Sequence, residues 1–145
     1  MDDRIFYHLS RAENRIKTYM RKTFRENNIS ISPAQIGILF LLMENNSQSM
    51  SELSRVLEID NSSTTRLVDS LEKMDFVKRD SKPGDRRQYL IFLTEKGKKE
   101  VNRAKKIVRE ANEKVKEDIP EKELAIFLKV VNRLCTKPNK QSNLT

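Results

Sequence analysis

The segment from 49 to 96 constrains the fold of this chain more than any other part. A capping-box pattern opens a short helix over 49–57, and three residues separate it from a second helix over 61–74. β-rich flanks around Pro83-Gly84 then predict a hairpin with a basic tip. The order helix, turn, helix, hairpin predicts a helix-turn-helix followed by a wing.

The segments on either side are predicted to be helical. Apolar residues recur at spacings of three and four over 2–26, over 94–118 and from Pro120 to 134. Ser32-Pro33-Ala34-Gln35 opens a further helix that is apolar nearly all round, and this helix is predicted to be the buried centre. The predicted fold class is mainly α (α+β), a winged helix-turn-helix with long N- and C-terminal dimerisation helices.

A single domain is predicted over 1–135, with the winged-helix core at about 32–98 and a disordered polar tail over 136–145. The helices within 1–28 and 98–135 carry more apolar surface than one small winged domain covers. Core packing accounts for part of each apolar stripe, and packing between two subunits accounts better for the rest. The sequence therefore predicts a homodimer.

The charge balance is basic. The chain holds 29 Lys and Arg against 21 Asp and Glu, a net charge of +8, and the positive charge avoids 31–60 and gathers at the predicted wing and both ends. Such a balance suits a polyanionic partner. A generally solvated basic surface accounts for the charge alone equally well.

Residue types exclude several classes of protein. No apolar run approaches the roughly 20 residues that span a bilayer, so we expect a cytoplasmic protein with no membrane partner. One histidine and one cysteine far apart supply no zinc site, and three glycines form no phosphate-binding loop. We expect no enzyme, metal or cofactor. Cys135 is predicted to be a buried, inert thiol rather than a redox sensor.

The polar face of the helix over 61–74 carries small hydroxyls and one arginine, unlike the Glu/Lys pairs of an ordinary solvated helix. A helix of this kind can present side chains to base edges in the major groove. The residues predicted to do so are Asn61, Ser62, Ser63, Thr65 and Arg66. Ser49 and Ser51 are candidate phosphate contacts.

The hairpin supplies a second candidate probe, because an arginine is favoured in the negative potential of a narrow minor groove. The candidate residues at or near its tip are Lys82, Asp85, Arg86 and Arg87. Two adjacent helices alone occur in many proteins that bind no DNA, and the appended basic hairpin is what favours double-stranded DNA as partner. A winged-helix protein-interaction module without sequence-specific DNA readout stays open as the alternative.

Residues 32–100 resemble the MarR family of winged-helix transcription regulators. The resemblance rests on "SPAQ", "SELSRVLEID", "STTRLVDSLEKMDFVKR" and above all "DRRQYLIFLTEKG", which contains Asp85-x-Arg87 and Leu93-Thr94-x-x-Gly97. It implies a homodimeric regulator, most often a repressor at a palindromic operator, with its recognition helix at about 61–74. It also implies that Arg87 enters the minor groove, that Asp85 orients the wing arginine, and that Arg86 meets phosphate. The polar start at Asn61, Ser62 and Ser63 departs from the family pattern and leaves the operator sequence open.

The same resemblance implies a crevice between the dimerisation helices and the winged domain that takes a small aromatic or phenolic effector. Candidate residues, which combine apolar walls with cationic or hydroxyl groups, are His8, Arg15, Tyr19, Phe40 and Met43. The alternative is that these are core and interface residues with no ligand. His8 could instead act as a pH-sensitive interface residue.

Overall fold

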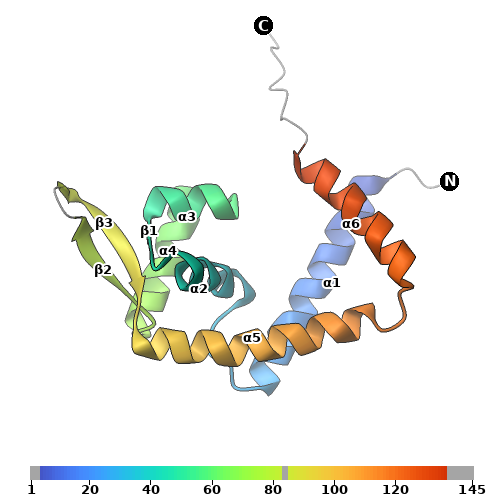
Figure 1. The fold of residues 1–145 in the computed structure, drawn as a ribbon, viewed down its shortest axis with the longest axis horizontal. Coiled ribbons are helices and arrows are strands. Elements are labelled where there is room, and N and C mark those ends of the chain that lie inside the picture. Colours follow the sequence, from blue (N-terminus) through green and yellow to red (C-terminus); the bar gives the residue numbers. More distant parts are fainter. Residues whose placement is uncertain (1–3, 83–84, 137–145) are drawn as a thin grey trace, which may run out of the picture. The chain divides into compact units, whose positions relative to one another are not determined.

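The structure of the chain is a computed structural model that describes residues 4–82 and 85–136; for 82 and 85–88 the description covers the backbone alone. Apart from one additional strand, β1 (Ser47–Ser49), the elements follow the predicted order (Figure 1). They are α1 (Ile5–Glu26), α2 (Pro33–Asn45), β1 (Ser47–Ser49), α3 (Met50–Leu57), α4 (Asn61–Lys73), β2 (Val77–Lys82), β3 (Asp85–Leu93), α5 (Glu95–Lys116) and α6 (Glu121–Thr136). The predicted fold class, mainly helical with a winged hairpin, is confirmed.

Local hydrogen bonds begin two of the helices, as the capping boxes predict. At α2, the Ser32 hydroxyl accepts from the Gln35 amide at 3.2 Å, and the Gln35 side chain accepts from the Ser32 amide at 2.7 Å. Ser49 and Glu52 form the same reciprocal pair at α3. Each box satisfies two amides that would otherwise lack a partner at a helix start.

The sheet has the order β1-β3-β2, and both pairs are antiparallel. Strand β1 is absent from the sequence prediction, because Ser47-Gln48-Ser49 is short and has no β-branched or apolar residue. It exists through its pairing with β3, in which Ser47 lies opposite Phe92 and Ser49 opposite Leu90. The wing therefore rests on a strand that directly precedes α3.

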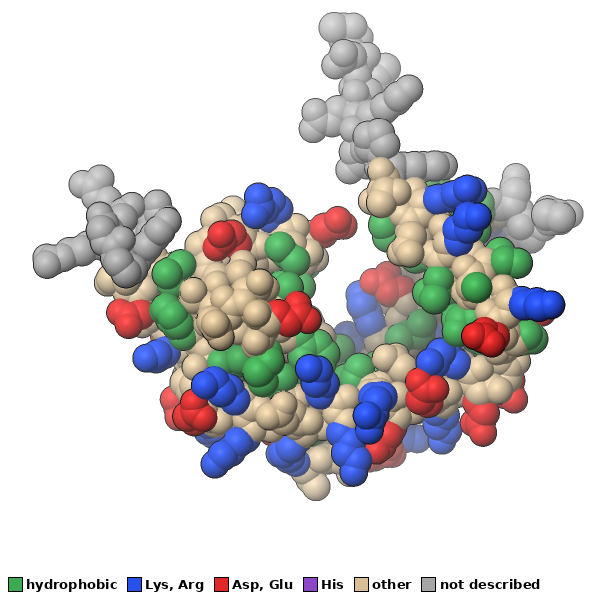
Figure 2. Space-filling view, viewed as in Figure 1, with side chains coloured by type: hydrophobic (Ala, Val, Ile, Leu, Met, Phe, Trp, Pro, Cys, Tyr) green, Lys and Arg blue, Asp and Glu red, His purple; other side chains and the backbone are tan. Residues whose placement is uncertain are grey.

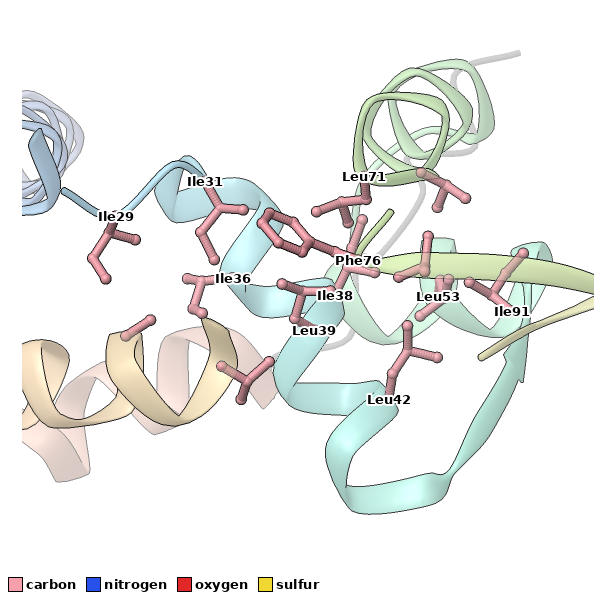
Figure 3. Packing of buried hydrophobic residues seen from close by; sticks show 14 of the residues in the cluster. Ile29, Ile31, Ile36, Ile38, Leu39, Leu42, Leu53, Leu71, Phe76 and Ile91 are labelled. Carbon is pink, nitrogen blue, oxygen red and sulfur yellow. The ribbon is translucent and has the colours of Figure 1, made fainter. Parts of the chain in front are cut away.

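The core lies around α2, as predicted. Ile38 and Leu39 are fully buried, and Leu42 is nearly so. Figure 3 shows these side chains among residues contributed by α3, α4, β3 and the turn before β2. The residues packed around them there are Leu53, Leu71, Phe76 and Ile91.

The first turn of α5 is fixed to the turn between α4 and β2. The Thr94 hydroxyl donates to the Asp75 carbonyl at 2.6 Å, and Lys96 Nζ donates to the Met74 carbonyl at 2.7 Å. At Gly97 the backbones come so close that an added Cβ would lie 2.0 Å from the Phe76 carbonyl oxygen. Glycine is required here by close approach of two backbone segments.

Contacts divide the chain into two compact units, residues 1–111 and 112–145. The second unit contains α6, in which none of the described residues is buried, and Phe127 is 55% exposed. Thr136, which the prediction assigns to the tail, is the last residue of α6; the rest of that tail lies outside the described residues. No helix within the described residues is long and apolar enough to cross a membrane.

Candidate nucleic-acid interface

Helix α4 divides into a buried and an exposed face, as its spacing predicts. Thr64, Val68 and Leu71 are fully buried against the core. On the other side Arg66 is exposed, and so are the neighbouring predicted reading residues Asn61, Ser62 and Thr65; Ser63 is half-buried. The structure thus brings the five predicted reading residues together at the N-terminal half of one helix.

Asp60 is the N-cap of α4 and gathers the first turn around its carboxylate. It accepts hydrogen bonds from the Ser62 hydroxyl at 2.5 Å, the Ser63 hydroxyl at 2.6 Å and the Ser63 amide at 2.8 Å. The hydrogen bond from Ser62, followed by those from Ser63, holds the pKa of the Asp60 carboxyl well below its ordinary value.

These bonds change what the exposed hydroxyls offer to a ligand. A serine or threonine hydroxyl has one proton to donate and two lone pairs to accept with. Ser62 and Ser63 donate to Asp60, and Thr65 donates to the Asn61 carbonyl at 2.8 Å. Their outward capacity is therefore as acceptors. Arg66 is the main donor on this face, since its guanidinium forms no hydrogen bond or ion pair with another described residue.

The predicted wing probes belong to the two strands of the hairpin. Lys82 ends β2 and pairs with Asp85, which begins β3 together with Arg86 and Arg87. The side chains of these four residues lie outside the described residues, so the expected contact between Asp85 and Arg87 is not described.

Two further charged contacts link α4 to β2, and sequence reasoning did not single them out. Arg79 of β2 donates to Glu72 at 2.7 Å and also to Asp69, both on α4. The only sequence signal was the placement of Asp69 on the exposed face of α4. We call Asp69, Glu72 and Arg79 the Arg79 cluster.

Comparison with known proteins identifies the family. A family model described as "MarR family" matches residues 31–89. Over 108 residues the chain is 31% identical to the uncharacterised HTH-type transcriptional regulator YsmB of Bacillus subtilis, covering 74% of each chain. The chain belongs to the MarR family. MarR proteins are transcription regulators, which are not enzymes.

Other MarR-family comparisons agree with the fold. The HTH-type regulator MhqR of B. subtilis is 30% identical over 94 residues, 65% of this chain and 63% of its own length. The chain thus spans less than two thirds of the length of several curated relatives that it matches. A solved structure, the transcriptional repressor CouR bound to a 23-mer DNA duplex, is 26% identical with a TM-score of 0.84, covering 90% of this chain and 92% of its own.

The remaining candidate residues of this MarR-family chain lie on α1, α2 and α3 and, for Ser49, at the end of β1. Ser49 donates its hydroxyl to Glu52 at 2.7 Å and lies 3.2 Å from the exposed Ser51 hydroxyl. Of the effector candidates, Arg15 lines an open hollow along α1, whereas Met43 lines a separate one between α2, β3 and α5. The others are Tyr19 and Phe40, both half-buried, and His8, which is exposed with its ring 5.3 Å from that of Tyr7.

The prediction for Cys135 is wrong in one respect, because its thiol is exposed in the single chain. Its helix, α6, has no buried residue within the described part of the chain, so a position on its apolar face is not a position in a core. Among the described residues no group of three or more His, Cys, Asp or Glu side chains is arranged to hold a metal ion.

Positive charge is concentrated on α5 rather than on α4, where Arg66 and Lys73 are balanced by Asp69 and Glu72. Helix α5 carries nine Lys and Arg residues against four Glu. On the face shown in Figure 2, Lys and Arg side chains are frequent over α5, with acidic side chains between them. A basic surface of this kind attracts DNA without reading its sequence.

Proposed function

We propose that this chain is a homodimeric repressor that binds an inverted-repeat operator. The observation that carries the proposal is the exposed N-terminal face of α4, on which Arg66 has no hydrogen bond or ion pair with another described residue, in a member of a family of transcription regulators. The repressor role is supported by CouR, a repressor whose DNA-bound structure shares the fold. Such a protein acts at the chromosome, so the proposal includes a cytoplasmic location.

The homodimer is supported by apolar side chains that the single chain leaves uncovered. On α1, Phe6 is 90% and Ile16 50% exposed; on α6, Ile126 is 64% exposed. Burial of such side chains in a subunit interface favours the dimer by roughly 25 cal/mol for each Å² removed from water, before the entropic cost of association is subtracted. Twofold symmetry places two α4 helices about one DNA turn apart, which requires a palindromic site.

Each candidate residue has a distinct part in the proposal. Arg66 donates to a guanine, while the hydroxyls and the Asp60 carboxylate accept from the amino groups of cytosine or adenine. Asn61 reads an adenine edge. In the wing, Arg87 enters the minor groove with Asp85 orienting it. Phosphates are bound by Ser49, Ser51, Lys82 and Arg86.

Selection of bound sequences from random DNA by the purified chain tests this proposal. Enrichment of an inverted repeat with half-sites about one turn apart is expected. Enrichment of no sequence at moderate salt would instead favour a winged-helix protein-interaction module. Placing the recovered site upstream of a reporter then distinguishes repression from activation.

The two wing residues give different expected results in the same binding assay. Arg87→Ala should weaken operator binding by about 1–3 kcal/mol and relax the preference at the minor-groove position. Lys82→Ala should weaken binding to all sequences alike and reduce the slope of affinity against salt concentration. Unchanged affinity of a folded Arg87→Ala variant would contradict its assigned role.

Release by a small aromatic or phenolic effector is proposed for His8, Arg15, Tyr19, Phe40 and Met43. The probe is a panel of hydroxybenzoates added to the protein–operator complex, with dissociation followed by fluorescence anisotropy. Dissociation that Arg15→Ala abolishes supports the site, because the guanidinium is the group that would pair with a carboxylate. Dissociation by no member of the panel at millimolar concentration counts against it.

A further inference from the structure

An arginine occupies an inward-facing position of the wing. Residues two apart on a strand share a face, so Arg79 lies on the same side of β2 as Val77, which is 1% exposed. Its partner across the ladder is Ile91, which is fully buried. Lys78, by contrast, is on the outward face, with its Nζ 5.9 Å from the centre of the Phe92 ring. The alternation of the strand would place an apolar residue at position 79.

The guanidinium of Arg79 is held by two carboxylates of α4. One Nη donates to Glu72 at 2.7 Å and the other to Asp69, while the Arg79 side chain is only 28% exposed. A partly buried charge is tolerated when it is paired, and a planar fork can bridge two acceptors at once. The bridge ties the base of the wing to the C-terminal half of α4.

The bridge also determines what Arg66 can do. Asp69 lies three residues after Arg66, a spacing at which side chains of one helix meet and an arginine and an aspartate pair. In the structure Asp69 is paired with Arg79 instead, and Arg66 has no ion pair with any described residue. Without Arg79, Asp69 and Glu72 would lose their ion-pair partner, and Asp69 would lie within reach of Arg66.

We propose that Arg79 is a positioning residue for DNA recognition, which ties α4 to β2 and occupies Asp69 and Glu72 so that Arg66 stays available for DNA. This role rests on the proposed function, because it requires that α4 reads an operator. Arg79 acts through Arg66 and the wing, and its own side chain faces protein. A direct phosphate contact by Arg79 is the competing explanation for any loss of binding in its variants.

The test uses the full chain and the operator recovered by selection. The variants are Arg79→Met, Arg79→Lys and the triple change Arg79→Met with Asp69→Asn and Glu72→Gln. Lys78→Met is the matched control, since it removes a neighbouring positive charge from the outward face of the same strand. Fluorescence anisotropy gives the Kd for the operator and for an unrelated duplex of equal length, and circular dichroism gives Tm.

Arg79→Met and Arg79→Lys should lower the ratio of operator to unrelated affinity about tenfold, within the range of one lost arginine–guanine contact. The triple variant should recover to within about threefold of wild type, because the carboxylates that capture Arg66 are gone. Lys78→Met should leave the ratio unchanged. Ion pairs this close to solvent stabilise a fold little, so Tm should stay nearly constant. A purely structural role would lower Tm and leave the ratio intact.

A double-mutant cycle adds an independent readout. Arg66→Ala should cost about tenfold in affinity in the wild-type background and much less in the Arg79→Met background, since Arg66 is already occupied there. Equal losses in both backgrounds would overturn the proposal. A triple variant that binds the operator as weakly as Arg79→Met would also overturn the proposal. Wild-type binding by Arg79→Lys would overturn it too and would indicate a phosphate contact, because a lysine can replace an arginine at a phosphate.

Selection of an operator by the wild-type chain distinguishes failure of the positioning role of Arg79 from failure of the proposed function. If wild type selects an operator and Arg79→Met binds it unchanged, the positioning role alone fails. If wild type enriches no sequence, the proposed function fails and the positioning role falls with it. Arg79→Lys keeps the test decisive if the Met variant does not fold, because it retains a cation at the same place.

Discussion

Replacing Gly97 by alanine should destabilise the chain, although alanine is the better helix former. An added Cβ would lie 2.0 Å from the Phe76 carbonyl oxygen and 2.9 Å from its carbonyl carbon, whereas real Cβ atoms essentially never approach within 3.0 Å. The obstacle is backbone, so no side chain can rotate out of the way. The Phe76 carbonyl would have to move by about 1 Å, and it also accepts the Thr94 amide at 3.1 Å.

The magnitude follows from three opposing contributions. Overpacking costs about 1–3 kcal/mol, and weakening the bond between Thr94 and Phe76 costs about 1 kcal/mol more. Against this, alanine gains up to about 1 kcal/mol over glycine in a helix. The net loss expected for Gly97→Ala is about 1–3 kcal/mol, which lowers Tm by about 3–10 °C for a chain of this size.

Gly37 provides the matched control, because it also lies within a helix. A Cβ at Gly37 would meet only the Leu57 Cδ2 atom at 3.3 Å, the mobile end of a side chain. Gly37→Ala should therefore be neutral or stabilising by up to about 1 kcal/mol. Urea denaturation followed by circular dichroism, at one fixed protein concentration for all variants, measures both. The reasoning is refuted if Gly97→Ala is as stable as wild type, or more stable than Gly37→Ala.

Two further variants test the polar contacts. Glu100→Ala should lower the free energy of unfolding by about 2–4 kcal/mol. Glu100 is only 5% exposed and its carboxylate accepts the Ser30 amide at 3.0 Å, so its loss leaves a donor unsatisfied. The control is Glu110→Ala at an exposed position, and equal urea midpoints for the two variants would contradict the prediction. Asp60→Ala should be less stable than wild type at pH 7. The pKa of Asp60 is lowered in the folded chain, so its stabilisation is fully present above its unfolded pKa of about 4 and declines as pH falls below that value. The gap between Asp60→Ala and wild type should thus be smaller at pH 3, and a constant gap from pH 7 to pH 3 would contradict the assigned cause.

Features set by neighbours in sequence could be predicted, and those set by distant residues could not. The starts of α2 and α3 follow from Ser32 and Ser49, whose capping partners are three residues away. Strand β1 could not be predicted, since it depends on pairing with β3 more than forty residues later. Cys135 was misplaced for a similar reason: an apolar stripe indicates a buried face but not the partner that buries it.

The candidate interface shows the same division within one helix. The choice of α4 as reading helix came from its exposed polar residues. The direction of its hydroxyl hydrogen bonds could not be predicted from the sequence, because the protons of Ser62 and Ser63 could equally point to a base or to Asp60. Only the local geometry of the cap shows that the protons are used inside the protein, which leaves these two hydroxyls as acceptors toward a ligand.

The two ends of α4 are consequently held in different ways. Its N-terminal turn is held by two sets of bonds. Asp60 accepts from Ser62 and Ser63, and the fully buried Thr64 accepts the Ser54 hydroxyl of α3 at 2.9 Å. Its C-terminal half is tied to three other elements: Gln35 of α2 bonds to Ser70 at 3.0 Å, Arg79 of β2 bridges to the helix, and Lys96 of α5 holds the Met74 carbonyl. Because α4 is tied to α3 through Thr64 and to three other elements at its C-terminal half, its reading residues are presented at a set place, while the exposed Ser62 and Ser63 hydroxyls bond only to the cap. The orientation of those residues is then decided by a few local hydrogen bonds. Changes at Asp60 should therefore alter which bases are preferred. Changes at Arg79 should instead alter how strongly any operator is preferred over other DNA.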